Sequence, residues 1–172
     1  MTRIPSRMSA VSETNGRRMP TSEQPSSIER LLSDHRRIAL DSNVLIYLVD
    51  TVGAHYDAAA SIVDAIESGR IDGVLSTVGL VEILTGPARH GDGAAFEMLA
   101  NELRSLRLEI VPLLTGTAED AAWVRGRASL DLGDSIHLAT AHAVGATAFI
   151  TNDRHLRSTN VLEVVYLDDL VA

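Results

Sequence analysis

From Arg37 onward, short runs of β-forming residues alternate with stretches of helical periodicity. The expected strands cover residues 37–41, 71–77, 108–113, 147–151 and 161–167. Apolar side chains follow helical spacing over residues 55–69, 78–89, 93–107, 117–130 and 134–145. Strands that alternate with helices pair in parallel, because each helix returns the chain to the same end of the sheet. The sequence therefore predicts a three-layer α/β/α fold with a mostly parallel central sheet of about five strands.

A single domain is expected, since 172 residues with 45% hydrophobic content suit one core and are too few for two ordinary ones. Residues 1–35 are rich in Ser, Thr, Pro, Arg and Glu, so we expect a disordered N-terminal tail, with a short helix over residues 28–35 leading into the domain. The domain itself is expected to span residues 36–172. Within it, Pro87 is expected to interrupt the helix at residues 78–89.

The composition excludes several kinds of site. Because the sequence has no cysteine, it has no disulfide, zinc-thiolate site, iron–sulfur cluster or thiol nucleophile, which suits a reducing compartment such as the cytoplasm. Apolar runs such as residues 44–49 fall far short of the roughly 18 residues that cross a bilayer, so we expect a cytoplasmic protein without a membrane segment. With a net charge of -8, a nucleic acid would be held locally or through a bound cation.

Four carboxylates stand beside apolar runs at points where strands end or helices begin. Asp41 and Asp153 follow expected strands. Asp134 opens an alanine-rich helix, and Glu82 lies among apolar residues of another helix. In parallel α/β sheets, ligands gather at the carboxyl ends of the strands. We therefore expect the four side chains to meet at one edge of the sheet, where their repulsion calls for a positive partner such as a divalent metal ion.

Each acid alone also has an ordinary structural explanation. Asp41 and Asp134 suit helix caps and first turns, where backbone N–H groups and the helix dipole stabilise a carboxylate. Glu82 would be ordinary on a solvated helix face, and Asp153 would be ordinary in an Asn-Asp turn. None of these explanations requires the side chains to converge, so joint placement at one edge favours a site.

The motifs around these acids resemble those of the PIN-domain family, and within it the small VapC-like toxin ribonucleases. The matching segments are DSNVLIY with Asp41, VEIL with Glu82, DSIHLATA with Asp134 and TNDRHL with Asp153. They occur in the family's order between about residues 37 and 170. The resemblance implies that the four acids form a catalytic, metal-binding pocket with Mg²⁺ or Mn²⁺ as cofactor.

Neighbouring polar residues are expected to support the acids. Asn43 suits a role in orienting the acid two positions before it, and the resemblance places Thr151 and Asn152 beside the pocket. Asp131 lies three residues before Asp134 and competes with it for the assignment. We prefer Asp134, because it directly begins the DSIHLATA motif.

Other polar side chains receive weaker assignments. Arg154, directly after the last acid, is a candidate contact for an RNA phosphate. His137, His142 and His155 lie close to the acids in sequence, but none has a paired nucleophile or ligand spacing, and we interpret them as core or surface histidines. Trp123 suits packing or a subunit contact better than base stacking.

The resemblance implies a function. It implies a metal-dependent endoribonuclease, the toxin of a VapBC-type pair, which hydrolyses RNA with activated water to leave a 3′-hydroxyl and a 5′-phosphate. It further implies a VapB-like antitoxin that covers a groove and pushes an arginine into the acidic pocket, and it implies a homodimer. The alternative is a PIN-like module that binds RNA or a partner protein without cutting.

Overall fold

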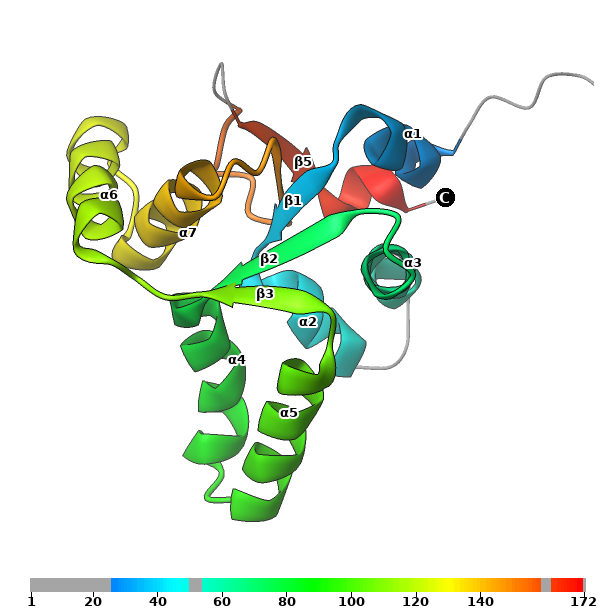
Figure 1. Ribbon diagram of the computed structural model, residues 1–172. Helices are drawn as coiled ribbons and strands as arrows, with labels where there is room; N and C mark the ends of the chain where they lie inside the picture. The colour runs from blue at the N-terminus through cyan, green and yellow to red at the C-terminus, as the bar shows by residue number, and fades with distance from the viewer. Residues whose placement is uncertain (1–25, 50–53, 159–161, 172) are drawn as a thin grey trace, which may run out of the picture.

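A sheet of five parallel strands lies at the centre of the computed structural model, which describes residues 26–49, 54–158 and 162–171 (Figure 1). The strand order is β3-β2-β1-β4-β5, and every pairing is parallel. The strands are β1 (Arg37–Leu40), β2 (Asp72–Ser76), β3 (Leu108–Val111), β4 (Ala148–Thr151) and β5 (Glu163–Tyr166). The predicted parallel sheet is confirmed. Of the tail predicted to be disordered over residues 1–35, residues 1–25 lie outside the described residues.

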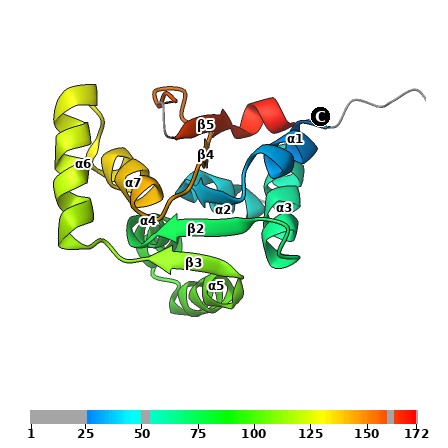
Figure 2. The same cartoon turned by 45° about the horizontal axis from the view of Figure 1, so that its top comes forward.

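Helices cover both faces of this sheet, as predicted (Figures 1 and 2). One face carries α7 (Leu132–Ala143), and α6 (Thr115–Ala128) packs against the outer side of α7. The other face carries α1 (Ser27–Asp34), α2 (Ser42–Val49), α3 (Ala54–Glu67), α4 (Thr77–Arg89), α5 (Gly93–Ser105) and the short 3-10 helix η1 (Leu167–Leu170). These layers give the α/β/α architecture that the alternating pattern predicts.

Two apolar cores join the layers. Successive residues of a strand point to opposite faces, so Ile38 and Leu40 of β1 enter the core under α1–α5. Ala39 lies on the other face, in a core with Val74, Phe149 and residues of α7. Because the strands are buried on both faces, they appear in the sequence as nearly continuous apolar runs.

Helix α1 belongs to the folded unit. It begins after Ser26, whose hydroxyl accepts a hydrogen bond from the Glu29 N–H at 3.2 Å. Leu31 is 4% exposed and lies in the larger core, where α1 contacts α3 and η1. The short helix predicted over residues 28–35 is therefore present, and it packs against the domain expected from residue 36.

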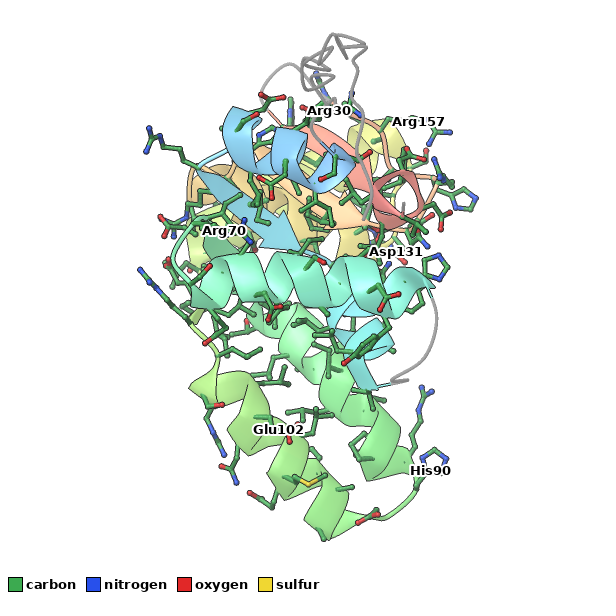
Figure 3. The ribbon with its side chains drawn as sticks, turned by 90° about the vertical axis from the view of Figure 1, so that its right-hand side faces the viewer. Arg30, Arg70, His90, Glu102, Asp131 and Arg157 are labelled. Carbon is green, nitrogen blue, oxygen red and sulfur yellow. The ribbon has the colours of Figure 1, made fainter. Side chains whose placement is uncertain are left out.

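Helices α4 and α5 form a hairpin that extends away from the sheet, with His90 near its turn (Figure 3). The expected interruption at Pro87 was wrong, because α4 continues to Arg89. Pro87 lies in the last turn, where its missing N–H removes only one helical hydrogen bond. Asp92 then caps α5 by accepting from the Ala95 N–H at 2.9 Å.

Candidate functional site

The ends of three adjacent strands set the position of the site. β1 lies between β2 and β4, with Leu40 in register with Leu75 and Ile150. The residues that follow these strands consequently lie side by side at the carboxyl edge of the sheet. Asp41 is the residue after β1, and α4, which carries Glu82, directly follows β2.

Asp41 is buried and held by neighbouring hydroxyl and amide groups. Its backbone N–H donates to the Ile150 carbonyl at 2.9 Å, which fixes the main chain beside β4. Its Oδ2 accepts from Thr151 Oγ1 at 2.5 Å and from Asn43 Nδ2 at 2.8 Å. Its Oδ1 accepts from Ser42 Oγ at 3.3 Å. The Asp41 carboxylate is therefore oriented before any ligand arrives.

Thr151 connects Asp41 to the loop that carries the last acid. The Thr151 hydroxyl is fully buried, and its oxygen accepts from the Asp153 N–H at 3.0 Å. The Asp153 carboxylate itself accepts from the backbone N–H and from Nδ1 of His155, both at 2.8 Å. The backbone hydrogen bond from His155, followed by the contact with its ring, lowers the pKa of Asp153 below its usual value. Asp153 is thus held as an anion.

Glu82 lies beside His137, which extends from α7. His137 Nε2 is 3.1 Å from Glu82 Oε2, and its Nδ1 is 2.8 Å from Ser76 Oγ. The imidazole is buried, whereas the Glu82 side chain is 40% exposed. The hydrogen bond from His137 lowers the pKa of Glu82 against the opposing effect of burial. Our interpretation of His137 as an ordinary core or surface histidine overlooked this contact.

Asp134 lies in the first turn of α7, next to other anions. Burial raises its pKa to about 6, and the charges of Asp131, Asp153 and Asp41 act in the same direction. Asp131, labelled in Figure 3, is the N-cap of α7, and its Oδ1 accepts from the Asp134 N–H at 2.8 Å. The competing acid therefore has a structural role at the helix start, and this agrees with the preference for Asp134.

Two of the four predicted acids, Asp41 and Glu82, lie together with His137 in a group that could hold a metal ion, with candidate ligand atoms within 4.8 Å of one another. Asp134 and Asp153 are not members of that group, although the charges of Asp153 and Asp41 act on Asp134. The oxygen donors of this cluster fit a hard divalent cation. Asn43 Oδ1 beside them is buried without a hydrogen-bond partner among the described residues. Carboxylate and amide oxygens are the ligands that Mg²⁺ and Mn²⁺ prefer.

Asn152 and Arg154 face η1. Asn152 Nδ2 donates to Asp168 Oδ1 at 3.1 Å, and the Asp168 backbone N–H donates to Asn152 Oδ1 at 3.1 Å. Arg154 pairs with Asp168 at 3.3 Å and Asp169 at 3.0 Å, and its guanidinium lies 4.1 Å from the ring centre of Tyr166. Both side chains thus anchor the Asp153 loop to η1. The phosphate contact expected of Arg154 remains a prediction.

The fold and the site together define a class of protein, the parallel α/β domains that carry an acidic cluster at the carboxyl edge of the sheet. Residues 38–162 match the PIN domain family, and the chain belongs to this family. No curated protein matches the sequence significantly. In the described residues, no helix combines the length and apolar character needed to traverse a bilayer.

Solved structures share the fold at low sequence identity. VapBC2 from Rickettsia felis, bound to a promoter DNA fragment, has a TM-score of 0.62 and 16% identity over 76% of this chain and 98% of that one. FitAcB from Neisseria gonorrhoeae has a TM-score of 0.54 and 22% identity over 67% and 87%. VapC20 from Mycobacterium tuberculosis, a sarcin-ricin loop cleaving toxin, has a TM-score of 0.52 and 17% identity over 65% and 86%. These likenesses support the fold.

Proposed function

We propose that this protein is a metal-dependent endoribonuclease, the toxin of a VapBC-type toxin–antitoxin pair, and that it acts in the cytoplasm. The observation that carries the proposal is an acidic cluster at the carboxyl edge of a PIN-domain sheet, in which Asp41 and Glu82 lie close together and the charges of Asp41 and Asp153 act on Asp134. Membership of the PIN family and the structural likeness to toxins such as VapC20 support the same activity.

Asp41, Glu82 and Asp134 would hold Mg²⁺ or Mn²⁺, with Asp153 adding negative charge at the rim. The bound ion would lower the pKa of a water molecule and neutralise charge that develops on the phosphate. The protein fixes the ligands in advance, because Thr151 and Asn43 hold the Asp41 carboxylate. Without a cation, the clustered carboxylates would repel an RNA phosphate, so productive RNA binding depends on the ion.

An antitoxin segment would occupy the apolar cavity of about 560 Å³ that lies between α2, α4 and α5. Leu45, Leu48, Met98 and Leu99 contribute to its lining, and Met98 is 60% exposed. Such a surface suits the apolar face of a helical or extended peptide from a VapB-like partner. A homodimer is also proposed, and Trp123, which is 66% exposed on α6, offers a subunit contact.

Cleavage of RNA by the purified protein tests the proposal. Structured and tRNA-like RNAs are incubated with Mg²⁺ or Mn²⁺, and products are examined for a 5′-phosphate. We expect cleavage by the wild type that EDTA and Asp41→Asn abolish. Asp72→Asn is the matched control, since Asp72 is exposed at the amino end of β2, the opposite edge of the sheet. RNA binding without products would favour a non-catalytic PIN-like module.

A further inference from the structure

A chain of polar contacts connects the start of α4 to the middle of α7. It begins at the Gly79 N–H, which donates to Ser76 Oγ at 3.0 Å at the N-terminus of α4. Ser76 Oγ then meets His137 Nδ1 at 2.8 Å, and His137 Nε2 meets Glu82 Oε2 at 3.1 Å. The first and last members belong to the same helix, so His137 bridges two points of α4.

The hydrogen positions follow from the partners. An ionised carboxylate only accepts hydrogen bonds, so Nε2 of His137 carries a hydrogen and donates to Glu82. Ser76 Oγ already accepts from Gly79, which leaves its own hydrogen free to donate to Nδ1. A neutral imidazole with its hydrogen on Nε2 satisfies every partner. An imidazolium does so too, because its Nδ1–H can donate to the second lone pair of Ser76 Oγ. Against the opposing effect of burial, the bond to Glu82 and the nearby acids raise the pKa of His137 above its usual value. Both ring nitrogens are engaged, so His137 has no lone pair to offer a metal ion in this arrangement.

Two glycines leave room for this contact. A Cβ on Gly79 would lie 2.7 Å from Leu75 Cδ1 and 3.3 Å from His137 Cε1, so a larger residue here would have to displace the Leu75 side chain and press on the imidazole. A Cβ on Gly133 would lie 2.9 Å from Glu82 Oε1. The Glu82 carboxylate is consequently confined between the imidazole on one side and the backbone of α7 on the other.

We propose that His137 is a positioning residue for the metal site, which acts by holding Glu82 through the Ser76–His137–Glu82 contacts. This inference rests on the proposed function, because it treats Glu82 as a cation ligand. A glutamate side chain is long and flexible, so a free carboxylate loses rotamer entropy when it binds an ion. The bond to a buried imidazole fixes Oε2 in advance and leaves Oε1 available to the cation.

Mn²⁺ affinity measured by calorimetry and by the electron paramagnetic resonance of free Mn²⁺ tests the role without RNA. We expect His137→Leu to weaken Mn²⁺ binding about 10-fold, because it removes a ligand's hydrogen-bond partner. His137→Gln retains a donor near the Nε2 position and should recover affinity to within about 3-fold of the wild type. His142→Gln is the matched control: His142 is an exposed histidine on the same helix, and its replacement should change nothing.

A double-mutant cycle shows whether His137 acts through Glu82. In a Glu82→Ala background, His137→Leu should cause no further loss of Mn²⁺ affinity. An equal loss in both backgrounds would overturn the proposal, as would unchanged affinity of His137→Leu in the otherwise wild-type protein. If His137→Leu fails to fold, two other variants replace it. Ser76→Ala should weaken Mn²⁺ binding, because it removes the partner of His137 Nδ1. His137→Gln should keep Mn²⁺ affinity within about 3-fold of the wild type.

Two outcomes separate this inference from the proposed function. If the wild type binds Mn²⁺ and shows the expected coupling but cuts no RNA, the nuclease proposal falls and the positioning role stands. If the wild type binds no Mn²⁺ at all, the positioning role falls whatever the RNA assay shows.

Discussion

Removing the Asp134 charge should stabilise the metal-free protein at neutral pH. Asp134 has a pKa raised from 3.8 to about 6, which corresponds to at most about 3 kcal/mol of unfavourable ionisation in the folded state. The side chain is partly exposed and therefore screened by solvent. The N-terminus of α7 also favours the anion by about 0.3–1 kcal/mol. We therefore expect Asp134→Asn to raise the free energy of unfolding by about 1–2 kcal/mol near pH 7.5 in EDTA.

The pH dependence has a definite direction. Because the folded-state pKa of Asp134 lies above its unfolded value, the folded protein holds this proton more tightly. The stability that the folded protein gains by binding this proton is complete below about pH 4, and it is lost as the pH rises through about 6. The difference in the free energy of unfolding between Asp134→Asn and the wild type should accordingly disappear in acid and reach its full size above about pH 7.

Urea denaturation followed by circular dichroism measures this difference across the pH range, with Asp72→Asn as the control for loss of an exposed acid. Mg²⁺ at about 100 times its Kd should then stabilise the wild type by about 2.7 kcal/mol and the variant by less, so the order of stability reverses. If Asp134→Asn is no more stable than the wild type at any pH in EDTA, the Asp134 carboxylate does not suffer the burial and the repulsion that its raised pKa indicates.

Three further substitutions test other parts of the structure. Thr151→Val should lower the free energy of unfolding by about 1–3 kcal/mol in urea denaturation, because it leaves the buried Asp41 carboxylate without its 2.5 Å bond; unchanged stability would contradict this. Gly133→Ala places a methyl group 2.9 Å from Glu82 Oε1 and should weaken Mn²⁺ binding in calorimetry about 10-fold, whereas normal affinity would show that Glu82 is not confined. Leu31→Ala should cost about 2–4 kcal/mol in the same denaturation assay, and no loss would mean that α1 does not contribute to the core.

The sheet could be predicted from the sequence because its strands are buried on both faces and alternate with helices. That pattern specifies parallel pairing and places Asp41 and Thr151 at neighbouring strand ends. Helix α1 was also predicted to within one residue, although it is short and flanked by polar sequence, and its stability depends on the burial of Leu31 against α3 and η1. The end of α4 at Arg89 was predicted, but the interruption at Pro87 was not found, because periodicity does not show that a proline in the last turn of a helix is tolerated.

The site was predictable where it follows strand ends and unpredictable where it depends on contacts between helices. His137 lies three residues after Asp134, on the same side of α7, so the sequence held a signal for its proximity to the acids. Its bonds to Ser76 and Glu82, however, depend on how closely α4 packs against α7. The pairing of Arg154 with η1 similarly depends on where the C-terminal segment lies.

The most direct test of the acidic site is a crystal structure of the protein grown with Mn²⁺, in which anomalous scattering locates the ion. We expect a peak at about 2–2.5 Å from carboxylate oxygens of Asp41 and Asp134, with Glu82 within reach of the ion and still bonded to His137. A saturated crystal in which Mn²⁺ lies elsewhere, or in which these carboxylates contact no ion, would contradict the proposed metal centre.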